Sequence, residues 1–453
     1  MNSAHTHRFV ARFVVEADTP LFVGSGESSL LKDALVSKDV NGFPMIPGTS
    51  ITGILRHSLD EGNSEIWNSI FGDTDTKGAA SRLKVSSAYM MLNESTCSEG
   101  IINSIELDPI IVKRFTNLPS RQHVRINEKG VAVKNGLFDN EIVYKGTRFI
   151  FEIELRGNDT DNNVWLDLIN FIQNPTFRIG SGTRNGYGRL KVVKNYNCTF
   201  DLQNSDSFEK YLNFKPSLNA PIQWNVTNLS AALHSNYTRY DLHLIPDSFF
   251  IFSEGFGDED VDNKPKEEET VIYSDKGLHF TPKNTVIPAS SIKGALSHRV
   301  AYHYNKMKMQ FEANGKTYTD NDAVYELFGD MSGTLNREPR AGNVFLDDLY
   351  LSEGDIVNDK IFNHVAIDRF TGGAIQGALF SEKVSNLLIG GFNMSIYVKQ
   401  NEYSEYIIDS LEMTLEDVCK GLLPLGGMTT KGNGMFTGQL SRNGEVLFNY
   451  ASI

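Results

Sequence analysis

Few residues in this sequence have the types and spacing that catalysis requires. No HExxH, GxSxG or paired metal-ligand motif occurs, and the ten histidines are dispersed along the chain. His57 and His298 lie at equivalent places on a repeated helix, where a partly buried structural role is the simpler interpretation. The remaining candidate is Asp33, in the loop-like stretch GSGESSLLKDALVSKD at 24–39. An aspartate in a loop is by itself usually a turn residue, so its role depends on its context.

Two segments place hydroxyl and cationic side chains at the start of a predicted helix, PGTS at 47–50 and PASS at 288–291. A helix N-terminus offers free N–H groups and partial positive charge to a phosphate. Ordinary helix capping with surface cations would explain the same pattern, and this alternative stays open. The candidate phosphate contacts at these two helices are Ser50, Thr52, Arg56, Ser291, Lys293 and Arg299.

Two glycine-rich loops, GSGTRNGYG at 180–188 and GGMTTKGNG at 426–434, combine glycines, hydroxyls and one cation each. This composition is typical of a backbone nest around an anion, which makes Gly182, Arg184 and Lys431 candidate contacts. A tight connection between strands, without any ligand, is an equally good interpretation. Neither loop fits the phosphate-loop or dinucleotide-binding pattern, so we expect no nucleotide cofactor.

These segments occur in pairs because the chain contains an internal duplication. IPGTSITGILRHSL from Ile46 returns 241 residues later as IPASSIKGALSHRV from Ile287. HVRINEKGVAVKNGLF from His123 likewise returns as HVAIDRFTGGAIQGALF from His364, and the glycine-rich loops keep the same order. We therefore predict two homologous domains at 1–200 and 238–453, joined by a polar connecting segment at 201–237.

Alternating and helical periodicities predict the elements that must position these residues. Apolar side chains alternate over 9–17, as in a strand, and recur at helical spacing over 51–59, 292–300 and 164–172. Strands and helices in this order predict an α+β fold, a sheet with helices on one face, in each domain.

Composition restricts the partners and the environment of the chain. The 453 residues carry a net charge of −13, so any contact with RNA must be local. The acidic stretch GDEDVDNKPKEEET at 257–270 is interpreted as a solvated loop. Cys97, Cys198 and Cys419 form no CxxC pair, and no apolar run is long enough for a membrane helix, so we expect a cytoplasmic protein without zinc or a membrane partner.

Taken together, Asp33, the segment NGFPMIPGTSITGILRHSL and the segment GSGTRNGYGRL resemble the RAMP superfamily, and specifically the backbone subunit of type III CRISPR effector complexes. The resemblance covers both domains. It implies two tandem RRM-like (ferredoxin-like) domains with loop and thumb insertions, which bind CRISPR guide RNA and target RNA beside other RAMP and effector-complex subunits. A tandem fusion is similar to the fused subunits of subtype III-D.

The resemblance also implies site residues. In the family, an aspartate before the IPG(S/T)SLKG motif cleaves target RNA with a divalent metal, and Asp33 stands at that place, with Mg²⁺ or another divalent cation as its expected cofactor. Lys32 would help to neutralise charge beside it. In the second domain the spacing points to Glu269, and the enlarged acidic loop contains Asp262 as another candidate. The residues expected near the thumbs and the RNA are Arg125, Lys134, Asp368, Arg369 and Gln376.

Three functions remain open from the sequence. The first is a guide-binding subunit that also acts as a metal-dependent endoribonuclease through Asp33. The second is a purely structural guide-binding subunit, in which Asp33 is a turn residue. The third, a stand-alone endoribonuclease that matures the guide transcript, fits the duplicated architecture less well.

Overall fold

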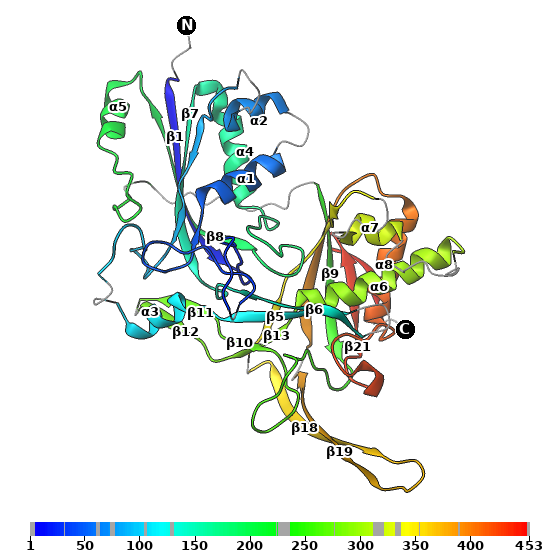
Figure 1. Cartoon of the computed structure of the whole chain (residues 1–453). Coiled ribbons are helices and arrows are strands. Elements are labelled where there is room, and N and C mark those ends of the chain that lie inside the picture. The colour runs from blue at the N-terminus through cyan, green and yellow to red at the C-terminus, as the bar shows by residue number, and fades with distance from the viewer. Residues whose placement is uncertain are drawn as a thin grey trace.

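The computed structural model describes residues 5–450 except 31, 60–63, 73–77, 104–106, 127–130, 223, 225–235, 276, 311–320, 331–336, 353 and 388–389. Within this part of the chain, two α+β units lie side by side, each built on one antiparallel sheet (Figure 1). The predicted fold class and tandem arrangement are confirmed.

The sheet of the first unit has the strand order β2-β4-β7-β1-β8, and β3 also pairs with β7. Phe13 on β1, which lies between β7 and β8, pairs with Phe151 on one side and with Asn195 on the other. Four core strands lie side by side in the spatial order β8, β1, β7, β4. This is the strand order of a ferredoxin-like sheet, as predicted. The strands are β1 (His7–Ala17), β2 (Met45–Ile46), β3 (Leu83–Val85), β4 (Ala88–Met90), β7 (Arg148–Gly157) and β8 (Leu190–Asp201).

Helices α1 (Gly48–Leu59), α2 (Ser64–Phe71) and α4 (Asn162–Ile172) cover one face of this sheet (Figure 1). Helix α1 buries Ile51 and Leu55, which confirms the expected periodicity, and it begins three residues before the predicted start. Trp165 of α4 lies 5.7 Å from the ring of Phe9 on β1. The core of the unit therefore lies between these helices and the sheet.

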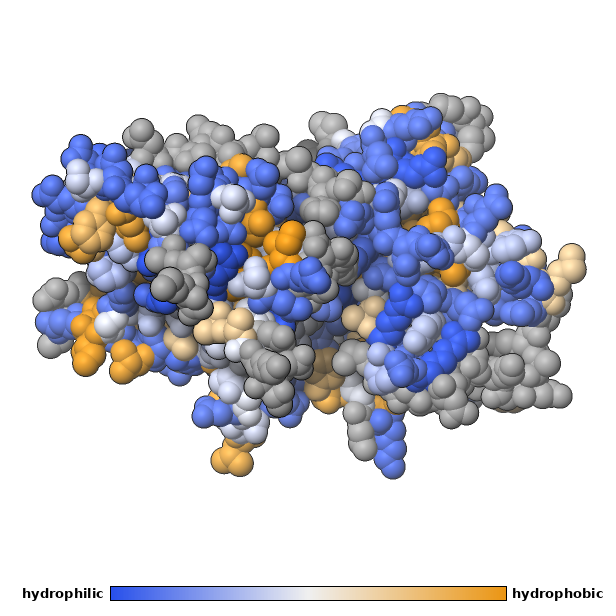
Figure 2. All heavy atoms as spheres, turned by 90° about the horizontal axis from the view of Figure 1, so that it is seen from above, coloured by the Kyte–Doolittle hydropathy of each residue, from blue (hydrophilic) through white to orange (hydrophobic). Residues whose placement is uncertain are grey.

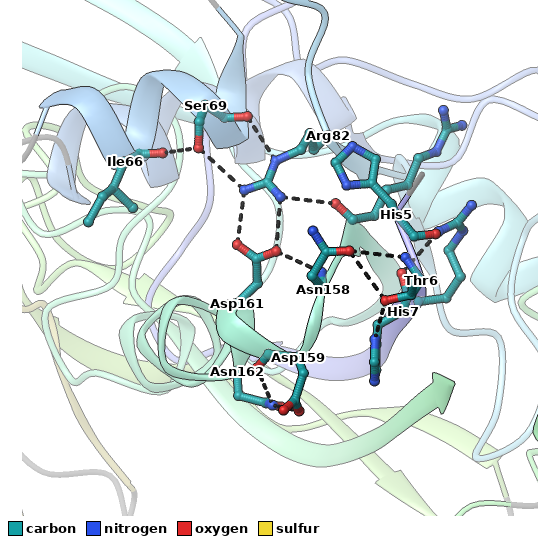
Figure 3. A network of polar contacts seen from close by, with 12 residues as sticks. His5, Thr6, His7, Ile66, Ser69, Arg82, Asn158, Asp159, Asp161 and Asn162 are labelled. Atoms are coloured by element: carbon teal, nitrogen blue, oxygen red, sulfur yellow. Dashed lines mark hydrogen bonds and ion pairs between the residues drawn. The ribbon is translucent and has the colours of Figure 1, made fainter. Parts of the chain in front are cut away.

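A polar network fastens the N-terminal end of β1 to the helices (Figure 3). Arg82 donates to both carboxylate oxygens of Asp161, at 2.9 and 3.1 Å, and to the carbonyl oxygen of Ser69 at 3.0 Å. Asn158 accepts from the main-chain N–H of Thr6 at 3.1 Å, beside the short 3-10 helix Asp159–Asp161. The loop with Asp33 follows the opposite end of β1, so this network serves the fold.

The second unit repeats the arrangement with the strand order β16-β20-β9-β21-β22. Its helices cover one face of the sheet, and α6 buries Ile292 and Leu296 as the repeat predicts. The strands are β9 (Tyr237–Pro246), β16 (Val344–Leu346), β20 (Phe392–Lys399), β21 (Phe436–Arg442) and β22 (Glu445–Asn449), and the helices are α6 (Ala289–Met307), α7 (Asp322–Phe328) and α8 (Glu405–Cys419).

Each unit has a two-stranded hairpin between its second and third core strands, which we call its thumb. The first thumb consists of β5 (Ser120–Ile126) and β6 (Ala132–Glu141), and the second of β18 (Ile356–Ile367) and β19 (Ala374–Leu387). His123 pairs with Phe138 in the first, and His364 pairs with Phe380 in the second. The second thumb projects away from the body of the molecule (Figure 1).

The segment that follows β8 packs against the face of the first sheet opposite the helices. Arg12 on β1 is 1% exposed, and its guanidinium donates to the carbonyl oxygen of Lys215 at 2.7 Å and to Glu152 at 2.6 Å. Helix α5 (Ser205–Leu212) belongs to this segment. The described part of the connecting segment is thus attached to the first unit through a buried charge.

A hairpin of the second unit, β11 (Val271–Ser274) and β12 (Gly277–Phe280), completes the core of the first unit. The Tyr273 hydroxyl donates to the carbonyl oxygen of Met91 at 2.8 Å, and the Phe280 ring lies 5.7 Å from Phe115 of α3 (Pro109–Thr116). Two further small sheets comprise β10 (Glu267–Glu268), β13 (Asn284–Ile287) and β17 (Leu349–Leu351), and β14 (Gly329–Asp330) with β15 (Arg340–Ala341).

Buried ion pairs join the two units. The guanidinium of Arg121 lies 2.6 Å from Glu268 and 2.5 Å from Asp348, and we call these three residues the junction cluster. Burial by itself would raise the pKa of Glu268, but Arg121 lowers it to about 2. The prediction that 257–270 is a solvated loop is therefore wrong for Glu268, whose side chain forms an ion pair with Arg121 between the two units.

The surface seen from above is mostly hydrophilic, with hydrophobic residues scattered singly or in small groups (Figure 2). No helix among the described residues is both long and apolar enough to cross a membrane.

Candidate nucleic-acid interface

The first N–H group of each repeated helix is already occupied by a side chain. Gly48 donates to the hydroxyl of Ser87 at 3.3 Å, and Ala289 donates to the carboxylate of Asp348 at 2.8 Å. A Cβ on Gly48 would lie 2.6 Å from the carbonyl oxygen of Val85, so this close approach requires glycine. Any phosphate at these helices would therefore meet the hydroxyl-bearing residues that follow the first N–H group.

In the first unit, the predicted contacts on α1 are only partly available. Ser50 is half-buried, and the hydroxyl of Thr52 donates to the carbonyl oxygen of Gly48 at 2.8 Å. Arg56 donates to Asn68 of α2 at 3.4 Å, and His57 is exposed. The helix thus uses Thr52 internally and directs Arg56 toward its neighbour.

In the second unit, the two predicted cations of α6 have different surroundings. Arg299 forms an ion pair with Asp417 of α8 at 2.6 Å, so its charge is offset within the unit. Lys293 reaches the first unit, where its ammonium lies 3.3 Å from the amide oxygen of Asn185. Burial and the nearby Arg184 lower the pKa of Lys293 to about 8. Ser291, at the start of the same helix, is exposed.

The glycine-rich loop of the first unit contacts the second unit. Arg184 donates to the carbonyl oxygen of Gly342 at 3.0 Å, and its guanidinium lies 4.9 Å from the ring of Phe345. Arg178 and Arg189, which flank the loop, both pair with Asp347, at 2.6 and 2.7 Å. Gly182 adopts a φ of +72° within this loop. The structure therefore shows the loop as part of the junction between the units.

The glycine-rich loop of the second unit is more open. Lys431 is exposed at the end of the short 3-10 helix Thr429–Lys431, and its ammonium lies 5.5 Å from the ring of Phe380 in the second thumb. This loop and thumb together present a cation beside an aromatic ring, which is a chemistry that single-stranded nucleic acid can use.

The thumbs carry the other predicted cations. Arg125 is exposed on β5, and Arg369 is exposed in the turn of the second thumb. The carboxylate of Asp368 accepts from the main-chain N–H groups of Phe370 and Thr371 at 2.9 and 2.8 Å, and so it shapes this turn. Phe370 is 100% exposed at the tip. Lys134 and Gln376 also lie exposed on the thumbs.

The candidate carboxylates Asp33 and Asp262 occupy equivalent places. Gly24 forms an isolated antiparallel bridge with Val36, and Ser253 forms the same kind of bridge with Pro265. Each aspartate precedes the second partner of its bridge by three residues, and each is exposed beside the returning strand of its thumb. Asp33 accepts from the main-chain N–H of Asp139 at 3.0 Å, and Asp262 from that of Ser381 at 2.8 Å.

Glu269, to which the sequence spacing pointed, lies elsewhere. It forms an ion pair with Arg114 of α3 in the first unit. The counterpart of Asp33 is Asp262, as the two bridges show. The sequence spacing pointed elsewhere because Pro288 follows Pro265 by 23 residues, whereas Pro47 follows Val36 by 11. Sequence reasoning missed Asp139 and Ser381, which bind the two carboxylates. They lie at equivalent places in the repeated thumb segments, and this repeat was the signal that could have identified them.

Lys32, expected beside Asp33, donates to the carbonyl oxygen of Leu118 and to Glu141, both at 2.7 Å. It therefore anchors the loop to the thumb. Within the described residues, no group of three or more histidine, cysteine, aspartate or glutamate side chains could together hold a metal ion. Asp33 offers a carboxylate oxygen at this place, and hard oxygen ligands of this kind suit Mg²⁺, which often keeps several waters.

The chain was compared with known families and structures. The sequence model of the RAMP superfamily matches residues 14–191 and 279–437, one region in each unit. Two chains of the type III-B Cmr-beta complex, solved by cryo-EM, are similar: one, in the apo state, is 16% identical and covers 41% of this chain and 96% of its own length, with a TM-score of 0.32. The other, in the complex bound to cognate target RNA, is 17% identical and covers 40% and 96%, with a TM-score of 0.31.

No curated protein gives a significant match. The two regions matched by the superfamily make up well over half of the 453 residues and include both repeated helices and both thumbs. The chain belongs to the RAMP superfamily.

Proposed function

We propose that this chain is a guide-RNA-binding backbone subunit of a type III CRISPR effector complex, similar to subtype III-D, and that it cleaves guide-complementary target RNA. The observation that carries the proposal is the duplicated placement of an exposed aspartate beside the returning strand of a thumb, Asp33 in the first unit and Asp262 in the second. The first site is the stronger candidate, since the motif resemblance includes Asp33. Other RAMP and effector-complex subunits are the proposed protein partners.

Contacts with RNA would be local and independent of sequence. Arg125, Arg369 and Lys431 are exposed cations that suit phosphate groups, while Lys293 and Arg184 lie where the units meet. Phosphate, 2′-OH and shape contacts suffice when base pairing between guide and target reads the sequence. A net charge of −13 is compatible with this, because only a narrow strip of the surface needs to be basic.

A divalent cation, Mg²⁺ or another, would be held by Asp33, whose Oδ2 accepts from the main-chain N–H of Asp139. When bound, such an ion supplies charge stabilisation and orientation for in-line attack of a 2′-OH on the adjacent phosphate. The protein positions its own groups: the loop holds Asp33 beside the thumb, and the thumb would hold the target strand next to it. The exposed turn of the second thumb, with Phe370 at its tip, suits contact with an unstacked nucleotide.

The test is cleavage of a guide-complementary RNA, with Mg²⁺ or with EDTA, by complexes assembled with the wild-type chain, Asp33→Ala, Asp262→Ala or Glu259→Ala. Glu259 is an exposed carboxylate in the same acidic loop as Asp262 and serves as the matched control. We expect Asp33→Ala to abolish one cut and Asp262→Ala to abolish another, while guide binding and all other cuts persist.

Each alternative has its own outcome. If the cutting pattern is the same for all variants, the chain is a purely structural subunit. If the chain alone processes a guide transcript without its partners, it is a stand-alone maturation enzyme. Loss of guide binding together with cutting would mean that the aspartates serve the fold.

A further inference from the structure

In both units, the loop that carries the candidate aspartate is hydrogen-bonded along the returning strand of the thumb. In the first unit, Glu141 on β6 donates its main-chain N–H to the carbonyl oxygen of Ala34 at 2.9 Å. In the second, Lys383 on β19 donates in the same way to Asn263 at 2.9 Å. The aspartate precedes this attachment point by one residue in each case, so its backbone follows the thumb.

The first unit adds a reciprocal pair of hydrogen bonds. The main-chain N–H of Asp33 donates to Oδ1 of Asp139 at 2.8 Å, and the main-chain N–H of Asp139 donates to Oδ2 of Asp33 at 3.0 Å. Each aspartate thus accepts from the backbone of the other. Among the described residues, no hydrogen bond reaches Oδ1 of Asp33, which leaves one oxygen for a ligand.

The second unit achieves the same result with a serine. The N–H and hydroxyl of Ser381 both donate to Oδ2 of Asp262, at 2.8 and 2.9 Å. The main-chain N–H of Asp262 lies 3.1 Å from the hydroxyl oxygen of Ser381 and 3.1 Å from its carbonyl oxygen. Ser381 therefore holds one oxygen of the aspartate and its backbone together.

We propose that Asp139 and Ser381 are positioning residues, which fix the catalytic aspartate of their unit to the thumb so that one carboxylate oxygen faces the RNA. The inference rests on the proposed function. An exposed aspartate on a loop would otherwise rotate, and fixing one oxygen in advance reduces the entropy lost when the other meets its ligand. The same contacts attach each proposed cleavage site to the thumb of its own unit. The site therefore forms only where the loop and the thumb are in contact.

The two units supply conservative variants for one another. Asp139→Ala removes the acceptor for the Asp33 N–H, whereas Asp139→Ser introduces the side chain that performs this task in the second unit. Ser381→Ala removes the hydroxyl, whereas Ser381→Thr keeps it. All four variants keep the main-chain N–H that donates to the aspartate, so a change isolates the side chain.

The experiment measures single-turnover cleavage of target RNA by complexes assembled with the full chain, together with guide affinity and the target concentration for half-maximal rate. We expect Asp139→Ala to slow the cut of the first unit, and Ser381→Ala that of the second, by about 3- to 30-fold. Affinity and the half-saturating target concentration should stay unchanged, and Asp139→Ser and Ser381→Thr should restore most of the rate. The cut of the other unit is the internal control in each complex.

Two results would overturn this inference and leave the proposed function in place. One is an unchanged rate for Asp139→Ala and Ser381→Ala when Asp33→Ala and Asp262→Ala abolish their cuts. The other is a loss of guide affinity that the conservative variants do not rescue, because it would show that Asp139 and Ser381 only support the fold. If Asp33→Ala and Asp262→Ala leave all cuts intact, the proposed function fails, and the positioning role fails with it.

Discussion

Arg121 is the residue in which the two units depend most directly on each other. Its side chain is 2% exposed, and its partners Glu268 and Asp348 come from the other unit. The hydroxyl of Tyr350 also donates to Glu268, at 2.7 Å. A buried pair of this kind adds little net stability compared with apolar residues, but removing one partner leaves an uncompensated charge.

We therefore expect Arg121→Ala to lower the free energy of unfolding by about 3–5 kcal/mol, because Asp348 would stay buried without its cation and Glu268 would keep only Lys266, at 3.6 Å. The measurement is chemical denaturation of the purified chain. Arg239→Ala is the matched control: its pair with Asp241 is exposed, and the expected change is about 0–1 kcal/mol. Equal changes for the two variants would contradict the structural role of the junction cluster.

The elements show how a contact between units constrains the backbone. Gly146, in the turn before β7, has a φ of +89°, and a Cβ there would overlap the carbonyl oxygen of Val271 on the β11 hairpin. Gly100 has a φ of +79°, with nothing within 4 Å of its Cβ position. The two glycines share the same backbone requirement, and only Gly146 also has a steric one.

Gly146→Ala should accordingly destabilise the chain more than Gly100→Ala. We expect about 2–5 kcal/mol for the first, from left-handed backbone strain plus overlap with the hairpin, and about 1–2 kcal/mol for the second, from strain alone. Thermal and chemical unfolding of both variants would measure the difference. A similar decrease in the free energy of unfolding for the two variants would mean that the β11–β12 hairpin does not pack against the first unit as described.

Local patterns predicted the elements well. The strand at 9–17 and the helices from Ile51 and Val164 followed from periodicity, and the internal repeat predicted the second unit. Long-range pairing was not predictable, because Arg121 and Asp348 are 227 residues apart and neither stands in a recognisable motif. The position of Asp262 was ambiguous for a related reason: an insertion that builds β10 to β12 shifted the spacing on which the comparison with Asp33 relied.

At the scale of the whole molecule, the cationic side chains fall into two groups, one exposed and one paired within the protein. The net charge is −13, yet several cations are exposed on the thumbs and on the second glycine-rich loop, while others are paired inside the protein. The proposed binding of RNA would use a small number of phosphate contacts, and the affinity would then depend on salt in proportion to that number.

We expect Arg125→Ala and Arg369→Ala each to reduce the slope of log affinity against log salt concentration by about 0.7, the value for one phosphate contact with a single strand. Guide-RNA binding at several salt concentrations measures this slope. Lys210→Ala, an exposed cation on α5 outside the proposed interface, should leave it unchanged. A slope that none of these substitutions alters would place the RNA elsewhere.

The junction joins unlike surfaces: the glycine-rich loop and thumb of the first unit meet the helix start and the small sheet of the second. Two similar units arranged in this way are not related by a twofold axis, so the molecule has a head and a tail. An RNA strand also has two different ends. If the proposed strand runs along both units, it can do so in only one of two directions, and the order of the units along the polypeptide would set the order in which a guide is read.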